Sequence, residues 1–403
     1  MVTLRPQTSD FKPQTSYDVI IVGGSVAGAA TAFWLGQAGF RVLVLDRAVF
    51  PRDKVCGEGI MPVGVEILSD MGISASLRAQ GAWPFYGITF YDHHGCSASG
   101  IFPDATERPG LIIRRLHLDA LLLQKAATVP GVEIRQGFYV TRVLEQQGRV
   151  CGVAGRLIKA DKASEEFFTA LLTVGADGLQ SIFHRLGRIR VRRPRPQRFG
   201  VRAHLKGVEG LGSRVEVMTS PIGELYIAAH SQDMAMVALL LRRQAMKNLG
   251  GDLEAGYWEI LHSIRPFGER IERSKLISPV MASGPLGSRV HPCVGDGFLL
   301  IGDSGGALDP IAGEGMALSL RSAKVAVQVA TEAFCSCDFS ADRLSAYSAA
   351  REAMFRPLAR LTDLLLFLSR HERLAHWSIT SLHSHPTVMN KLLAVASGLY
   401  SSH

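Results

Sequence analysis

The sequence has few cysteines, and no spacing organises them. The six are scattered: Cys56, Cys96, Cys151, Cys293, Cys335 and Cys337. They form no Cys-x-x-Cys pair and have no matching histidine cluster, so neither a disulfide framework nor a zinc site is indicated. We interpret His93 and His94 as turn residues, because a metal would need further ligands that the sequence does not place beside them. We therefore expect reduced thiols and no resident metal.

Long apolar runs are also missing. The first run, residues 19–22, is too short for a membrane span and lacks the flanks of a signal peptide, so we expect a cytoplasmic protein. Much of the net charge of +8 comes from residues 184–198, which hold seven arginines and two prolines. No aromatic platform accompanies them, so we expect a solvated connection and no nucleic-acid partner. If these arginines attract a ligand, an anionic nicotinamide cofactor is a better candidate than a nucleic acid.

What is present suits a folded protein of several domains. The 403 residues exceed what one compact core usually holds, and the chain is 47% hydrophobic and 20% charged. The polar residues 1–16 are expected to be a loose tail.

Residues 17–46 organise the rest of the chain. Apolar residues 19–22 predict a buried parallel strand. Gly23, Ser25 and Gly28 follow at the small positions of a G-x-G-x-x-G turn, where backbone can approach a pyrophosphate. A helix and a second strand come next, and Asp46 ends that strand where a ribose hydroxyl could be bound. Ser25 in the middle glycine position weakens the match.

Two later motifs make this pattern specific. Residues 174–185, VGADGLQSIFHR, place Asp177 at the end of another strand. Residues 301–315, IGDSGGALDPIAGEG, place Gly302 and Asp303 at the end of a third. Asp303 could accept from a ribityl or ribose hydroxyl, and the N–H groups of residues 313–316 could face a flavin from a helix N-terminus.

With these three motifs in order, the chain resembles the FAD-dependent oxidoreductases of the p-hydroxybenzoate hydroxylase fold. The resemblance covers residues 17–330. The loop FPRDKVCGEG is similar to one in a branch that includes geranylgeranyl reductases, flavin-dependent halogenases and biosynthetic monooxygenases. It implies bound FAD, with NADH or NADPH as a transient reductant. The implied cofactor-binding residues are Gly23, Ser25, Ala27, Gly28, Asp46, Arg47, Lys54, Gly57, Arg115, Val140, Asp177, Gly302, Asp303, Pro310, Gly313, Gly315 and Met316.

The expected fold is α/β with an α+β insert: a Rossmann-type FAD-binding domain, an antiparallel-sheet substrate domain and a helical C-terminal region. The FAD-binding domain is expected in three segments, residues 1–84, 106–190 and 286–335. The substrate domain would use a hairpin at 85–105 and the sheet at 191–285. Residues 336–403 would form helices that cover the substrate side, with a peripheral membrane contact as the alternative.

Candidates for catalysis are few, because flavin chemistry needs no protein nucleophile. Cys56, Glu58 and His230 are the catalytic candidates. His204 and Tyr226 are the candidates for substrate contact. Each also has a simpler interpretation: an inert thiol, a loop acid bonded to backbone, or an ordinary strand residue.

The leading functional hypothesis is an NAD(P)H-dependent monooxygenase that uses O₂ on an apolar or aromatic biosynthetic substrate, free or carrier-bound. A prenyl reductase is the first alternative, although the Tyr-x-Trp-x-Phe-Pro segment associated with those enzymes is absent. A halogenase is the second, although its Trp-x-Trp-x-Ile-Pro segment is absent. A non-catalytic FAD-binding protein is the third. The sequence indicates no oligomeric state.

Overall fold

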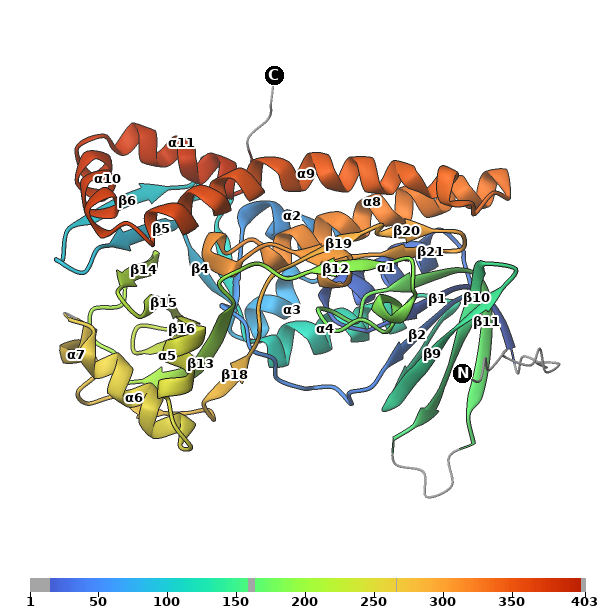
Figure 1. Ribbon diagram of the computed structural model, residues 1–403, viewed down its shortest axis with the longest axis horizontal. Helices are drawn as coiled ribbons and strands as arrows, with labels where there is room; N and C mark the ends of the chain where they lie inside the picture. The colour runs from blue at the N-terminus through green and yellow to red at the C-terminus, as the bar shows by residue number, and fades with distance from the viewer. Residues whose placement is uncertain (1–14, 159–163, 266, 400–403) are drawn as a thin grey trace, which may run out of the picture.

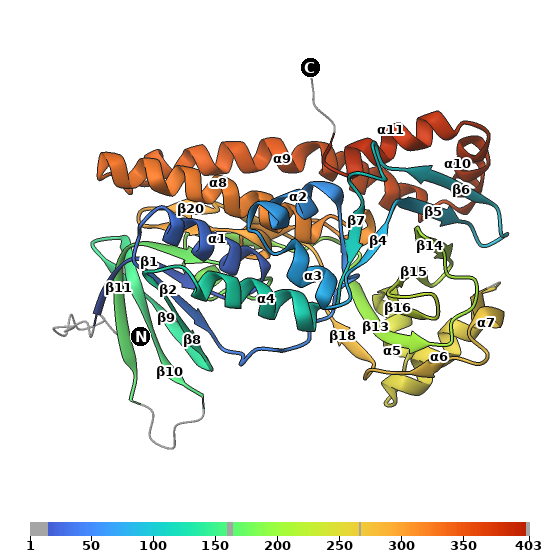
Figure 2. The same cartoon turned by 180° about the vertical axis from the view of Figure 1, so that it is seen from behind.

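The computed structural model describes residues 15–158, 164–265 and 267–399. A mixed sheet, a mainly antiparallel sheet and a layer of C-terminal helices make up the molecule (Figures 1 and 2). The predicted fold class is confirmed. Of the tail predicted at residues 1–16, residues 1–14 lie outside the described part, and Ser16 already belongs to a strand. No helix among the described residues is long and apolar enough to cross a membrane.

The first sheet is parallel at its centre, in the order β20-β21-β11-β1-β2-β8, with β9 and β10 joined at β11. Strands β2 and β21 of this sheet are buried along their whole length, as expected for strands inside a mainly parallel sheet. The strands are β1 (Thr15–Val22), β2 (Val42–Asp46), β8 (Val132–Gln136), β9 (Phe138–Gln146), β10 (Arg149–Leu157), β11 (Glu166–Gly175), β20 (Val294–Gly295) and β21 (Phe298–Leu300). The covering helices are α1 (Val26–Gln37), α4 (Arg115–Ala127) and α8 (Gly315–Ser336).

Strands β8 and β9 are consecutive in the chain but do not pair with each other. β8 pairs in parallel with β2, and the turn at Gln147–Gly148 joins β9 to β10. Both turn residues have positive φ, 51° and 80°, which suits a tight hairpin. The sequence alternation was right for strands, but it carries no information about which strand is the neighbour.

The second sheet has the order β17-β13-β16-β15-β14-β5-β6, with β18 also beside β13. The hairpin β5–β6 joins it through a parallel pairing with β14. The strands are β5 (Gly87–Tyr91), β6 (Ser97–Ile101), β13 (Arg198–Lys206), β14 (Val215–Ser220), β15 (Gly223–Ala229), β16 (Met234–Arg242), β17 (Lys275–Leu276) and β18 (Met281–Ser283). On one side lie α5 (Arg243–Asn248), α6 (Leu253–Ser263) and α7 (Phe267–Arg270).

Short elements connect the two sheets. These are β3 (Gly59–Ile60), α2 (Pro62–Asp70), α3 (Ser74–Ala79), β4 (Trp83–Phe85), β7 (Gly110–Ile112), η1 (Ile182–Arg185), β12 (Arg190–Arg192), β19 (Ser288–His291), η2 (Gly302–Gly305), β22 (Gly306–Ala307) and η3 (Pro310–Ala312).

The arginine-rich connection is exposed at Arg190 and Arg193, as expected, but Arg198 is buried at the start of β13.

Three C-terminal helices span both parts of the molecule. They are α9 (Ala341–Leu368), α10 (Glu372–Ser384) and α11 (Pro386–Ala396). Figures 1 and 2 both show α9 running along α8, and α10 and α11 lying over β5 and β6. Apolar residues of α11, including Met389 and Leu393, join a core with Phe85, Ile88 and Met236. These helices therefore pack as part of the fold and cover the second sheet. We call α9, α10 and α11 together the roof.

Candidate active site

The three glycine-rich motifs meet at the carboxyl ends of neighbouring strands β1, β11 and β21. Gly23 has φ +104°, and a Cβ there would lie 2.4 Å from the carbonyl oxygen of Ala176. A Cβ on Gly28 would lie 1.8 Å from the carbonyl oxygen of Gly23, and one on Gly302 would lie 3.0 Å from Cβ of Ala27. The glycines are thus required because backbone segments of different motifs touch.

The first turn of α1 is left open to a ligand. Ser25 is its N-cap residue, yet its side chain caps no N–H group of the helix. Instead, its hydroxyl donates to Asp119 at 3.0 Å and accepts from Arg115 at 2.8 Å. The N–H groups and positive end of α1 can therefore serve an anion. The serine in the middle glycine position is part of a buried polar network rather than an obstacle.

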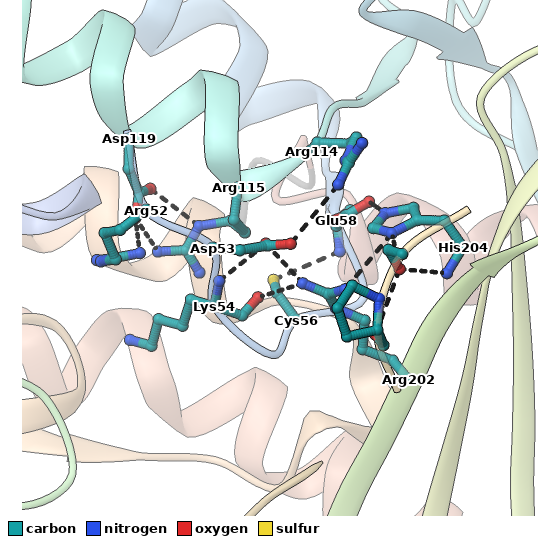
Figure 3. A network of polar contacts seen from close by, with 12 residues as sticks. Arg52, Asp53, Lys54, Cys56, Glu58, Arg114, Arg115, Asp119, Arg202 and His204 are labelled. Atoms are coloured by element: carbon teal, nitrogen blue, oxygen red, sulfur yellow. Dashed lines mark hydrogen bonds and ion pairs between the residues drawn. The ribbon is translucent and has the colours of Figure 1, made fainter. Parts of the chain in front are cut away.

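Cations surround this helix end (Figure 3). Asp119 is fully buried and accepts from Arg115 at 2.9 and 2.8 Å, while Arg52 lies 2.6 Å away. Lys54 is half-buried beside them; desolvation lowers its pKa, as does Arg115, while Asp303 opposes that shift. Three cations thus face one fully buried carboxylate here, and a diphosphate would balance the remaining charge.

Asp46 stands at the end of β2 with its carboxylate held by backbone. It accepts from the Gly24 N–H at 2.7 Å and the Ala48 N–H at 2.8 Å. A carboxylate has about four acceptor positions, so two remain for ribose hydroxyls. Arg47 is exposed, and Val140 is buried in the core of the first sheet.

One cavity of about 370 Å³ extends from these loops to the second sheet and the roof. A Cβ on Gly57 or Gly315 would meet nothing within 4 Å, so both glycines border open space. This cradle and the cationic corner fit a large planar, phosphate-bearing cofactor. The predicted residues that line the cavity are Ser25, Ala27, Lys54, Cys56, Gly57, Glu58, Arg115, Tyr226, Gly302, Asp303, Pro310, Gly313, Gly315 and Met316.

Six predicted cofactor residues do not line this cavity. Gly23, Gly28, Asp46, Arg47 and Val140 belong to the strand ends, the turn and the core beside it, so their roles stay predictions. Asp177 accepts from the Ile182 N–H at 2.7 Å and so orders the turn after β11. Burial raises the pKa of Asp177, although hydrogen bonds with Ser181 and Ile182 oppose this.

The far walls of the cavity are apolar. The second sheet contributes Val217, Ala228, Met236, Ala238 and Leu240. The roof contributes Leu365 and Leu368 of α9, Ile379 and Leu382 of α10, and Leu393 of α11. A long apolar molecule is the ligand that this surface would bind, because burial of each CH₂ group is favourable by about 0.8 kcal/mol.

Glu58 borders the cavity, and its carboxylate lies between two histidines behind the cavity wall. Its Oε2 accepts from Nε2 of His204 at 2.9 Å and of His230 at 2.7 Å. Burial alone would raise the pKa of Glu58, but these hydrogen bonds lower it to about 2. Glu58 has φ 59°, a strained conformation for a residue other than glycine.

His204, a candidate for substrate contact, lies away from the cavity surface. His204 is fully buried, bonds to Ser278 at 2.9 Å and to Glu58, and does not border the cavity. His230 also lies behind the wall. Arg202 and Arg114 are near enough to lower the pKa of His204 further, after the larger effect of burial. The two arginines make this region positively charged, which disfavours a metal cation. The Glu58 carboxylate is therefore better described as accepting from the two imidazole N–H groups.

Cys56 lies at the cavity wall. Its sulfur accepts from the Glu58 N–H at 3.4 Å and lies next to Arg115 (Figure 3). The thiol thus has a backbone N–H and a guanidinium beside it where the cofactor loops meet the cavity.

A second polar network, which the sequence did not reveal, joins the second sheet to the cofactor loops. Arg198 of β13 pairs with Glu224 of β15 and lies 3.4 Å from Asp309. Tyr226 donates to the carbonyl oxygen of Ile311 at 3.2 Å. Arg198, Glu224 and Tyr226 tie the second sheet to the third glycine-rich loop, and no motif marks Arg198 or Glu224.

Glu314, also missed, borders the cavity just before α8. It is buried, and its Oε1 has no hydrogen-bond partner among the described residues. Burial raises its pKa well above the usual range, with Arg321 acting weakly against this. The carboxyl group of Glu314 therefore lies at the N-terminus of α8, the helix end that was expected to face a flavin.

Comparison with known proteins agrees with this geometry. A family described as "FAD binding domain" matches residues 16–239. The chain is 24% identical over 366 residues to a 1H-pyrrole-2-carbonyl-[peptidyl-carrier protein] chlorinase of Pseudomonas fluorescens, covering 82% of this chain and 79% of the relative. It is 28% identical over 344 residues to a menaquinone reductase of Mycolicibacterium smegmatis, covering 79% and 77%.

The fold is shared with solved flavoproteins. The structure of the flavin-dependent brominase Bmp2 superposes with a TM-score of 0.82 at 21% identity, covering 95% of this chain and 94% of that one. At this identity the likeness shows the fold and leaves the reaction open.

Proposed function

We propose, on the premise that the chain belongs to the FAD binding domain family of FAD-dependent oxidoreductases, that it reduces a carbon–carbon double bond in a long apolar substrate. FAD, when bound, supplies the two electrons. NADH or NADPH is proposed as the transient reductant, because the sequence has no second dinucleotide-binding motif. The observation that carries the proposal is Cys56, a thiol beside Arg115 at the junction of the cofactor loops and the apolar cavity.

The chain's own residues divide the work. Ser25, Arg115 and Lys54 would hold the phosphates, and Asp303 a hydroxyl of the cofactor. The apolar walls would align the alkene and exclude water. Sγ of Cys56 would give the proton that the alkene carbon needs, and Arg115 would stabilise the thiolate until it regains a proton from solvent.

Aromatic hydroxylation fits the acids of the cavity less well, because a phenol substrate needs a base. Glu58 is held by two histidines, and Glu224 is paired with Arg198. Burial raises the pKa of Glu314 well above its usual range, which disfavours the charged form that a base needs. Menaquinone, the substrate in the name of one relative, supports a long apolar molecule as the substrate class.

The test is product analysis with FAD-loaded protein, NAD(P)H, and a panel of prenyl alcohols and prenylated quinones. We expect a product heavier by two hydrogens without oxygen. Cys56→Ala should lower the rate at least about 100-fold, in the range of a lost acid catalyst, while FAD stays bound. Reduction at an unchanged rate in Cys56→Ala would remove the assigned proton donor. No reduced product from any of these substrates would overturn the proposed reaction.

Oxygen insertion, the reaction that the sequence alone favoured, is the second candidate. The apolar lining of the cavity supports it, because an apolar site excludes water from reactive oxygen species. The same assay under labelled O₂ separates the two: one labelled oxygen atom in the product would replace reduction by monooxygenation. An arm with added bromide and chloride tests halogenation in the same way.

A further inference from the structure

A second group of ligand-type side chains lies where the hairpin β5–β6 meets the roof. The turn supplies Asp92, His93, His94 and Cys96, and α10 supplies Glu372 and His376. Glu372 and His376 are four residues apart, so they share one face of the helix. Figure 1 shows α10 beside this hairpin. The sequence could not reveal the group, because its two halves are about 280 residues apart.

Three of these side chains converge on one point. A carboxylate oxygen of Asp92, the sulfur of Cys96 and a ring nitrogen of His376 all lie within 4.8 Å of one another. Nδ1 of His376 is 2.6 Å from Oδ2 of Asp92. The other oxygen of Asp92 accepts from the N–H groups of His94 and Cys96 at 2.9 and 2.8 Å. The carboxylate is thus buried and already oriented by the turn.

A further ligand is close at hand. The ring of His94 lies 5.1 Å from that of His376, centroid to centroid. His93, His94 and Glu372 form a second group with ligand atoms within 4.8 Å of one another. The acids here pair with histidines, Asp92 with His376 and Glu372 with His93. This differs from the Glu58 cluster, against which two arginines are placed.

We propose that Asp92, Cys96 and His376 bind one zinc ion, with His94 or water as the fourth ligand. A thiolate, an imidazole and a carboxylate are the donors that Zn²⁺ accepts in tetrahedral sites. A hard cation such as Mg²⁺ would not select sulfur and nitrogen. The hydrogen bonds from the turn to Asp92 act as the outer contacts that orient a ligating carboxylate.

The ion would join the hairpin to the cavity roof. The roof already contacts the hairpin through His383 Nδ1 and the Ser97 carbonyl, 2.8 Å apart, and through the Ile101 N–H and Asn390 at 2.9 Å. α10 also lines the cavity with Ile379 and Leu382. Zinc would therefore fix α10 to the hairpin at the edge of the cavity, a structural role that does not depend on the reaction.

The test uses FAD-loaded protein in a Cys335→Ser/Cys337→Ser background, because those two exposed thiols could also bind metal. After chelation and buffer exchange, zinc chloride is titrated by calorimetry and cobalt chloride by absorbance. We expect one zinc ion per chain, a higher unfolding temperature, and a thiolate-to-cobalt charge-transfer band. Cys96→Ser should abolish that band and weaken zinc at least about tenfold, by comparison with the loss of outer-shell partners.

The control variant is His262→Ala, an exposed histidine on α6 far from the cluster in sequence. It should bind zinc as the background protein does. His376→Ala should weaken binding as Cys96→Ser does; if it does not fold, the cobalt spectrum of Cys96→Ser decides alone. No saturable binding, or zinc affinity unchanged in Cys96→Ser, would overturn the site.

Discussion

One wall of the cavity is shaped mainly by backbone atoms and the other by side chains. The cofactor wall consists of the glycine-rich loops and the N-terminus of α1. There, glycines let three loops pack against one another, and the helix end has no side-chain cap. On the substrate wall, side chains from β14 to β16 and α9 to α11 form an apolar surface. The first wall therefore tolerates little change at a few positions, whereas the second can change shape while the protein still folds and binds its cofactor.

The largest expected effect is on the cofactor wall. Gly28→Val should remove bound FAD and destabilise the first sheet, because its Cβ would lie 1.8 Å from a carbonyl oxygen that cannot move without displacing β1. Gly212→Val is the matched control, since a Cβ there meets nothing within 4 Å. FAD content and thermal unfolding measure both. FAD retained at the wild-type level in Gly28→Val would contradict the backbone account.

The next effect tests the polar network between the walls. Arg198→Met should destabilise the protein by about 3–5 kcal/mol, because it leaves buried Glu224 and Asp309 without their cation. Adding Glu224→Gln should recover part of that loss. Arg195→Met, at an exposed position, is the control. Urea unfolding that is equal in all variants would show that the network does not join the walls.

The Glu58 cluster should make the free energy of unfolding depend on pH in the acidic range. Because the folded pKa is about 2 and the ordinary value is 4.5, the unfolded chain takes up the proton first as pH falls. About 3 kcal/mol of stability should be present above pH 4.5 and disappear between pH 4.5 and 2. Glu58→Gln should lose this dependence, and Glu352→Gln, on the surface, should keep it. Urea unfolding between pH 2.5 and 5.5 tests this.

The smallest effect belongs to the substrate wall. Ala238→Phe should leave FAD content unchanged and weaken binding of long substrates by about 1–3 kcal/mol, as overfilling of a packed site does. Short substrates should bind as before, which provides the internal control. Competition binding with chains of different length is the measurement. Loss of FAD in this variant would show that the two walls are not independent.

The same contrast explains what the sequence could predict. The turn at Gly23 and Gly28 and the acid at Asp46 lie within one βαβ unit, so local spacing revealed them. Ser25 was interpreted as a weakness, because its bond to Asp119 joins residues 94 positions apart. Arg198 was assigned to a solvated segment, since burial depends on the neighbouring strand and not on local charge.

The surroundings of the catalytic and substrate candidates were harder to predict for the same reason. Cys56 and Glu58 lie in a recognisable loop, but the side chains beside them, Arg115 and the two histidines, come from α4 and from β13 and the turn after β15. The roof was predicted as helices, yet its packing on β6 has no local signal.

Titration of the FAD-loaded protein with prenyl alcohols of increasing length tests the central claim, that one apolar cavity joins the flavin to the roof. The absorbance of the flavin reports occupancy, and no turnover is needed. We predict a change in the flavin spectrum and a dissociation constant that falls about tenfold or more for each added isoprene unit until the cavity is filled. A flavin spectrum that does not change, or affinity that is independent of chain length, would contradict a continuous cavity.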